Sequence, residues 1–176
     1  MTQPPPITDA TPPASSLLAA VQAERRAFAD AYWLDHPGPA VELAAFVEAF
    51  YTTRLFKLER LVLRLAGLPS SDAGARAVAR GETERFAAWR VQDRRGRREP
   101  ELLLIDVHAR TCSWFQAEPL ASGGTRLWFG SAVIPARLSA SGEPEMGWLF
   151  DALLGFHRHY SRALLKAAAV RLSKKR

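Results

Sequence analysis

The order in which strand-like and helix-like segments follow one another constrains the fold of this chain more than any single motif. A strand-like segment from Asp30 to Asp35 leads into a long amphipathic helical stretch. Strand-like segments separated by turn residues then run from Glu84 to Arg137, and one long amphipathic helix, roughly Pro144 to Leu172, closes the chain. We therefore predict an α+β fold in which a curved antiparallel sheet packs around the C-terminal helix.

The bulk composition is that of a single globular domain. With 176 residues, of which 48% are hydrophobic, the chain is long enough for one sizeable core. We predict a Pro-rich disordered tail over residues 1–16, one domain over 17–172 and a basic tail over 173–176. The single cysteine, Cys112, allows no internal disulfide and suits a reducing cytoplasm, and the N-terminal residues lack the pattern of a secretory signal. No apolar run reaches the roughly 18 residues that a membrane span requires.

Capping residues divide the helical part of the chain. A hydroxyl at residues 15–16 is expected to begin a first helix, and Thr53 to begin a new helix within the long amphipathic stretch, because such side chains accept orphan backbone N–H groups. Gly67 is expected to end that helix in a left-handed conformation. A further cap at residues 70–72 opens a small Ala-rich helix ending at Gly81, whose polarity indicates a lid or connector rather than core.

Two glycines inside regular elements predict local departures from regular geometry. Gly130 lies in the middle of the last long strand, which favours a bulge or bend in a curving sheet. Gly155 lies in the middle of the final helix, where it costs about 1 kcal/mol relative to alanine, so we expect another backbone to approach closely there.

Four short stretches resemble a known superfamily when taken in order. They are Ala29-Asp30-Ala31-Tyr32, the run from Leu58 to Leu68, Asp106-x-His108 after an apolar strand, and Phe156-His157-x-x-Tyr160 in the last helix. The chain resembles the helix-grip superfamily typified by START lipid-transfer domains and the birch-pollen allergen, and more narrowly one of its bacterial branches of unknown function. The resemblance implies up to seven strands, whereas about five are recognisable here, so we expect five to seven. It implies architecture and no particular chemistry.

Aromatic and aliphatic side chains of the sheet and the last helix are the candidate ligand-binding residues. In this architecture the cavity is whatever part of the core stays unfilled, and aromatic rings offer apolar area together with indole and phenol hydrogen-bonding groups. The alternative is that the same side chains are ordinary core. The candidates are Trp89, Trp114, Trp128, Phe150, Leu153, His157 and Tyr160.

Asp106, His108 and Arg110 form a second candidate set, as polar anchors for a ligand or as an acid–base pair. The alternative is a turn in which the carboxylate bonds only the local backbone. His157 and His159 point in different directions on a helix and cannot share a metal. We expect no metal and no cofactor, and find no catalytic motif.

The net charge of +6 does not by itself predict nucleic-acid binding. The basic residues gather in a turn at Arg94 to Arg98 and at the chain end, without interleaved aromatic residues, so solubility is the favoured interpretation. The leading hypothesis is a cytoplasmic, non-catalytic binder of a small apolar or amphipathic ligand, monomeric or homodimeric. A cofactor-free enzyme of the cyclase or hydrolase kind and an interaction protein with a filled core remain alternatives.

Overall fold

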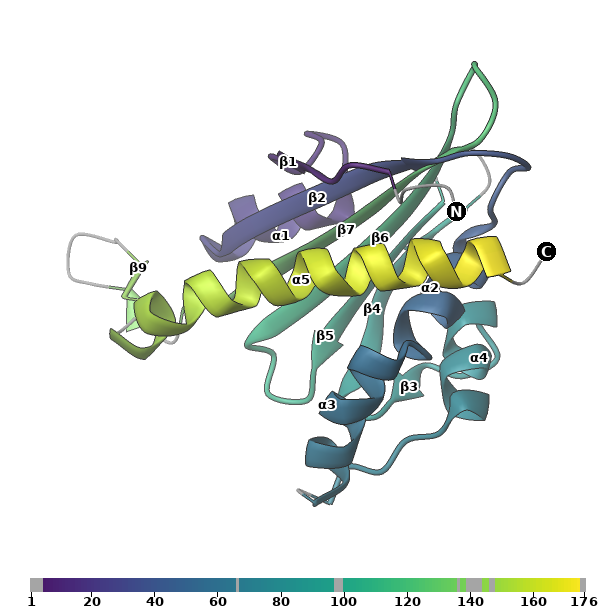
Figure 1. Cartoon of the computed structure of the whole chain (residues 1–176). Helices are drawn as coiled ribbons and strands as arrows, with labels where there is room; N and C mark the ends of the chain where they lie inside the picture. The colour runs from purple at the N-terminus through teal and green to yellow at the C-terminus, as the bar shows by residue number, and fades with distance from the viewer. Residues whose placement is uncertain are drawn as a thin grey trace.

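The structure is built on one open seven-stranded sheet, and helices pack on both of its faces (Figure 1). The structure is a computed structural model that describes residues 5–65, 67–96, 100–135, 137–138, 144–145 and 148–174. For residues 137–138, 144–145 and 148–154 only the backbone is described. The predicted α+β class and the helix-grip arrangement, a curved antiparallel sheet with a long C-terminal helix lying on it, are confirmed.

Within the described residues, seven strands form one antiparallel sheet in the order β1-β2-β7-β6-β5-β4-β3. β2, near the start of the chain, therefore pairs with β7, the last strand of this sheet along the chain. A short pair, β8 with β9, stands apart from this sheet. The strands are β1 Thr8–Ala10, β2 Phe28–His36, β3 Arg85–Phe86, β4 Trp89–Arg95, β5 Glu101–Asp106, β6 Thr111–Pro119, β7 Thr125–Val133, β8 Arg137–Leu138 and β9 Pro144–Glu145.

The helices divide between the two faces of the sheet. One face carries the long helix α5 together with α2 and α4, and the other carries α1 (Figure 1). α5 begins at Trp148 rather than at the predicted Pro144, which belongs to β9. The helices are α1 Leu17–Arg25, α2 Leu43–Tyr51, α3 Arg54–Leu65, α4 Asp72–Arg80 and α5 Trp148–Lys174.

Alternation of side chains along β6 and β7 gives the sheet two hydrophobic cores. Phe115 and Phe129 lie opposite each other and pack beneath α2 and α5, with ring centroids 5.2 Å apart. Trp114 and Trp128 point to the opposite face and pack beneath α1, with ring centroids 6.2 Å apart. Successive residues of a strand face opposite sides, so one strand supplies both cores.

A buried carboxylate holds α1 on its face of the sheet. Glu101 of β5 is fully buried, and its Oε2 accepts hydrogen bonds from the Leu17 backbone N–H at 2.8 Å and from the Trp114 indole N–H at 2.6 Å. Arg95 lies 3.6 Å from the other oxygen. The carboxylate thus accepts a hydrogen bond from an otherwise unpaired backbone N–H at the N-terminus of α1, where the helix dipole also favours negative charge.

The predicted helix caps are confirmed. The Ser16 hydroxyl accepts from the Ala19 N–H at 3.1 Å, and the Thr53 hydroxyl accepts from the Phe56 N–H at 3.1 Å. Ser71 caps α4 by accepting from the Gly74 N–H. Gly67 and Gly81 both adopt positive φ at helix ends, as their positions predicted.

Two expectations about peripheral segments are wrong. Thr8–Ala10 pairs with β2 as β1, so this part of residues 1–16 is an edge strand and not a disordered tail. α4 is not a lid, because Ala75, Val78 and Ala79 are buried against α2 in the main core. Alanine at two of these positions lets two helices approach closely, so a helix of polar composition still contributes an apolar face.

The bulge or bend predicted at Gly130 and the close backbone approach predicted at Gly155 are also wrong. β7 pairs with β2 and β6 without a register shift through Gly130, and the shift in the sheet lies instead between Val91 and Asp93 of β4. Gly130 makes room for α1: a Cβ there would lie 2.5 Å from Leu18 Cδ2 and 2.9 Å from the Asp30 carbonyl oxygen. Around Gly155 a Cβ would meet no described atom within 4 Å.

The same substitution at these two glycines should therefore change stability in opposite directions. We expect Gly130→Ala to lower the free energy of unfolding by about 1–3 kcal/mol, because α1 and the β2 backbone must shift. Gly155→Ala should raise it by up to about 1 kcal/mol through helix propensity alone. Urea unfolding of both variants tests this, and equal effects at the two sites would contradict the packing described.

Candidate functional site

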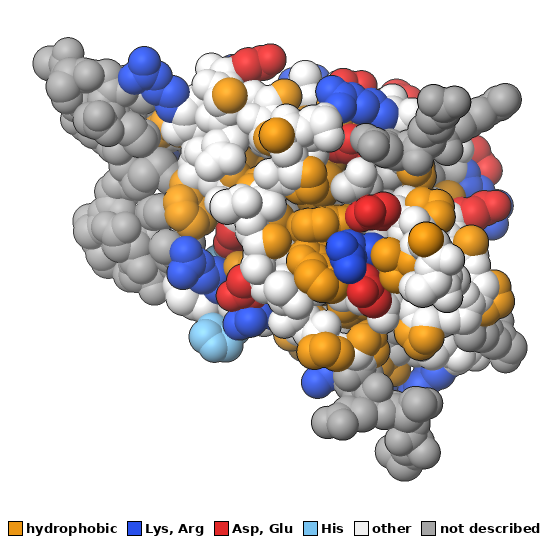
Figure 2. Space-filling model, turned by 90° about the horizontal axis from the view of Figure 1, so that it is seen from above, with side chains coloured by type: hydrophobic (Ala, Val, Ile, Leu, Met, Phe, Trp, Pro, Cys, Tyr) orange, Lys and Arg blue, Asp and Glu red, His pale blue; other side chains and the backbone are white. Residues whose placement is uncertain are grey.

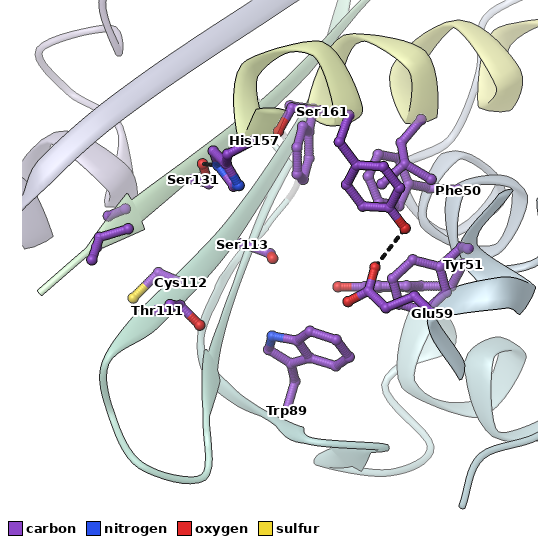
Figure 3. Close-up of a pocket in the computed structure, with 16 residues that line it drawn as sticks. Phe50, Tyr51, Glu59, Trp89, Thr111, Cys112, Ser113, Ser131, His157 and Ser161 are labelled. Atoms are coloured by element: carbon purple, nitrogen blue, oxygen red, sulfur yellow. Dashed lines mark hydrogen bonds between the residues drawn. The ribbon is translucent and has the colours of Figure 1, made fainter. Parts of the chain in front are cut away.

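A pocket of about 230 Å³ lies between the sheet and the helices α2, α3 and α5 (Figure 3). Its apolar wall includes aromatic rings from α2, α3, β4 and β7 and one leucine from α5. Its polar groups come from the same helices and from β6 and β7. The apolar lining residues include Phe50, Phe56, Trp89, Phe129 and Leu164, and the polar ones include Tyr51, Glu59, Ser113, Ser131, His157 and Tyr160.

Glu59 and Tyr160 join α3 to α5 at one side of the pocket. The Tyr160 hydroxyl donates to Glu59 Oε2 at 2.7 Å, across 101 residues of sequence. Glu59 is turned inward because it shares the inner side of α3 with the buried Phe56, three residues earlier. Burial raises the pKa of the Glu59 carboxyl, and the hydrogen bond from Tyr160 opposes this only in part. The pocket therefore favours a neutral carboxylic acid at this position.

The Tyr51 hydroxyl is the unsatisfied polar group of the pocket. The side chain is 1% exposed, and the hydroxyl has no hydrogen-bond partner among the described residues. Figure 3 shows it directed into the open space beside Glu59 and toward the side of Ser113. Burial raises the pKa of Tyr51, the charge of an ionised Glu59 would raise it further, and the nearby Ser113 hydroxyl, which makes no hydrogen bond of good geometry with Tyr51, opposes this only in part. The phenol therefore stays protonated. An orphan buried hydroxyl costs about 1–3 kcal/mol, which a bound molecule with an acceptor atom would recover.

A chain of hydrogen bonds reaches the pocket through Ser131 and His157, while its other two members, Asp30 and Tyr32, lie outside the lining. The Ser131 hydroxyl donates to Asp30 Oδ1 at 2.7 Å and lies 2.6 Å from His157 Nε2, while the Tyr32 hydroxyl donates to Asp30 Oδ2 at 3.0 Å. Because Ser131 gives its proton to Asp30, the imidazole N–H donates to Ser131. The serine therefore faces the pocket as a fixed polar group and not as an activated nucleophile.

Other reactive groups near the pocket do not form a catalytic set. Burial, followed by the charge of Asp106, raises the pKa of the Cys112 thiol to about 11, so it is protonated at neutral pH. Among the residues that the structure describes, no three His, Cys, Asp or Glu side chains lie together as metal ligands. The described site thus offers hydrogen bonds, apolar surface and one buried acid.

The structure separates the predicted ligand-binding residues into three groups. Trp89, His157 and Tyr160 line the pocket. Trp114 and Trp128 do not, because strand alternation turns them to the opposite core beneath α1. The side chains of Phe150 and Leu153 lie outside the described residues.

The predicted polar anchors Asp106, His108 and Arg110 lie outside the pocket lining, in the turn between β5 and β6. Asp106 Oδ1 accepts the backbone N–H groups of His108 and Arg110 at 3.0 and 2.8 Å, and its other oxygen accepts from the Thr111 hydroxyl. This is the turn-forming alternative considered for this sequence. The carboxylate organises backbone and leaves His108 exposed.

Tyr51 and Glu59 were missed by the sequence analysis. Glu59 is the single acid of α3, in the stretch Arg54–Leu65, and its place beside Phe56 on the helix was the available signal. Tyr51 closes an apolar run just before the helix break at Thr52 and Thr53, and no sequence feature distinguished it from the other apolar residues of that run. No sequence pattern indicates that α3 and α5 would bring Glu59 to Tyr160.

Comparisons of the chain with protein-family models, with curated proteins and with solved structures find no match. No helix in the described part of the chain combines the length and apolarity needed to cross a bilayer. On the face drawn in Figure 2, Lys and Arg side chains alternate with Asp and Glu and with hydrophobic ones, and form no continuous basic stripe. The function is therefore inferred from the pocket.

Replacing Glu59 by glutamine should change the pH dependence of stability. Because the folded pKa of Glu59 is raised, the folded chain binds more protons than the unfolded chain above the ordinary Glu pKa of about 4.3, and its stability falls as pH rises through this window. Glu59→Gln removes this titration. The advantage of the variant in free energy of unfolding should thus grow with pH from about 4 and level off above the folded pKa.

Urea unfolding across this pH range measures the difference. Glu82→Gln is the matched control, since Glu82 is exposed on the surface. Its difference from the original chain should stay nearly flat. A flat profile for Glu59→Gln as well would contradict a raised pKa of the buried Glu59 carboxyl.

Proposed function

We propose that this protein binds a small amphipathic molecule in the pocket between the sheet and α5, with the polar end of the ligand at Tyr51 and Glu59. The observation that carries the proposal is the buried Tyr51 hydroxyl, which faces the pocket without a partner among the described residues. Native proteins pair such groups with protein, water or ligand. A ligand acceptor atom satisfies the hydroxyl directly.

The polar groups define the chemistry of the ligand's polar end. Tyr51 supplies a donor, and Glu59 supplies an acceptor and, in its protonated form, which the raised pKa favours, a second donor. A carbonyl or amide group matches this pair. Its oxygen can accept a hydrogen bond from Tyr51, and an amide N–H can donate to Glu59. A carboxylate at the same place would be a buried charge without a Lys or Arg among the described lining residues, and is disfavoured.

The apolar wall and the volume define the rest of the ligand. Phe50, Phe56 and Trp89 surround the polar pair with aromatic surface. The volume of about 230 Å³ lies below the roughly 300–1,000 Å³ of sites for drug-sized ligands. These dimensions favour a compact molecule with one ring or a short chain over a long-chain lipid.

Proton-transfer catalysis in the same pocket is the second candidate function. It is favoured by the raised pKa of Glu59, since a carboxyl that stays protonated at higher pH can act as a general acid. The binding function ranks first because Ser131 and Cys112 are held as polar and protonated groups rather than as nucleophiles. Under the catalytic hypothesis Glu59→Gln abolishes turnover while ligand-induced stabilisation persists.

The strand order and the closing helix support the proposal that the chain is a divergent member of the helix-grip superfamily. In such a fold the space beneath the C-terminal helix is the place where a ligand fits, which agrees with the position of the pocket. The buried, unpaired thiol of Cys112 supports a location in the reducing cytoplasm.

Tyr51→Phe should weaken ligand binding without weakening the ligand-free fold. It removes an unpartnered hydroxyl and keeps the ring, so the melting temperature of the free protein should stay equal or rise. Benzamide should raise the melting temperature of the original chain more than toluene does, by linkage. The variant should bind benzamide about tenfold more weakly, which corresponds to one hydrogen bond of about 1.4 kcal/mol.

Tyr32→Phe is the matched control, because the Tyr32 hydroxyl bonds Asp30 and is not part of the pocket lining. It should lower the stability of the free protein by about 1 kcal/mol and leave benzamide binding intact. Equal benzamide affinity of Tyr51→Phe and the original chain would contradict the proposed orientation. Absence of stabilisation by both probes, with no small molecule retained in native mass spectra, would contradict the binding function.

A further inference from the structure

The outer face of α3 carries a continuous apolar stripe that the fold leaves exposed. Leu58, Leu61, Val62 and Leu65 recur at steps of three and four along the helix, and they are 64%, 55%, 66% and 84% exposed. Single exposed apolar residues are common on protein surfaces, but a contiguous stripe of large ones marks an interaction site. We call these four residues the α3 stripe.

The stripe is exposed because the opposite side of α3 is held by the body of the protein. Phe56 is buried, Glu59 accepts a hydrogen bond from Tyr160, and Arg60 donates to the Ser70 carbonyl and pairs with Asp72. The helix therefore cannot turn its stripe inward without losing these contacts. In Figure 1, α3 projects from one corner of the molecule, away from the sheet.

Cations border the stripe, and the single acid of α3 is turned away from it. Arg54 begins the helix and Arg64 lies one residue from the stripe; both are exposed. A hollow of about 250 Å³ runs along this border, lined by three cations and one acid together with a hydroxyl and a leucine of the stripe. The acid, Asp72, pairs with Lys57 and Arg60, so the lining keeps a net positive charge, to which Arg64 contributes. Its lining residues are Lys57, Arg60, Leu61, Arg64, Ser70 and Asp72.

This combination selects among possible occupants of the stripe. A second copy of the chain docked stripe to stripe would bring the cations at both ends of α3 against those of its partner, in either helix direction, and like charges repel. An anionic lipid surface instead offers apolar depth for the leucines and phosphate groups for the cations. Interfacial amphipathic helices have this same arrangement, with leucine on one face and Lys or Arg beside it.

We propose that α3 is a peripheral membrane-docking helix, whose stripe inserts into the interface of a bilayer containing anionic lipid while Arg64 and the neighbouring hollow receive the lipid phosphates. This docking is independent of what the pocket binds. It places the pocket close to the membrane, because Glu59 on the inner side of the same helix is a pocket wall.

Vesicle flotation of the full chain tests the proposal. Vesicles of phosphatidylcholine mixed with phosphatidylglycerol should carry the protein, vesicles of phosphatidylcholine alone should carry much less, and added salt should weaken the binding. The double variant Leu58→Gln and Leu65→Gln should lose affinity about tenfold or more, because it removes two inserted side chains. Val107→Gln, at an exposed apolar residue in the β5–β6 turn, is the control and should bind normally.

A second pair of variants tests the contribution of the cations that border the α3 stripe. Arg64→Gln should weaken binding to the mixed vesicles and reduce its salt dependence. Arg90→Gln removes one exposed cation of β4 and should change neither. An equal loss from both variants would mean that net charge, and not the border of the stripe, drives binding, and would overturn the proposal.

A labelling experiment tests insertion directly, without relying on a loss of binding. Cys112 is buried and its thiol stays protonated, so an environment-sensitive dye will react with Leu65→Cys in preference. Its emission should shift to the blue on addition of the mixed vesicles, whereas dye on Val107→Cys should not shift. No flotation with mixed vesicles, or no shift at position 65, overturns the proposal. So does a dimer in light scattering that the double variant dissociates while vesicle binding is absent.

Discussion

The alternation of large apolar side chains across β6 and β7 is the constraint on which the rest of the structure depends. Phe115 and Phe129 face one side and Trp114 and Trp128 the other, so neither face of the sheet can be left to water. The chain covers them by different means. α2, α4 and α5 form a broad layer over one face, while the short α1 covers the other and relies on the absent side chain of Gly130 and on the buried carboxylate of Glu101 for its place.

The pocket follows from how the broad layer is built. α2 and α5 of this layer and the neighbouring α3 come from two distant parts of the chain, and their aromatic rings leave a space that none of them fills. The groups at this space, Tyr51 and Glu59, are polar groups in a low-dielectric environment, where each is costly unless paired. The Glu59–Tyr160 hydrogen bond offsets part of that cost and also joins α3 to α5. The Tyr51 hydroxyl remains unpaired among the described residues and is available to a ligand.

α3 connects the two functional proposals because its two sides have opposite environments. Its inner side contributes Phe56 and Glu59 to the pocket, and its outer side presents the α3 stripe and its cationic border. Because one helix contributes to both the surface and the cavity, a shift of α3 at the surface would also move the pocket wall. The pocket variants and the stripe variants nevertheless change different residues, so the two proposals can fail independently.

The sequence by itself determined the element order, the helix caps at Ser16, Thr53 and Ser71, and the long C-terminal helix, because these depend on residues that are neighbours in the chain. It also placed Trp89, His157 and Tyr160 among the candidates. Only the tertiary structure decided which face each tryptophan takes, that α4 is core, and that Gly130 serves packing. It alone brought Glu59 to Tyr160, 101 residues away, and left Tyr51 unpartnered. Such long-range contacts depend on how the helices pack on the sheet, and the local hydrophobic periodicity of a sequence does not predict that packing.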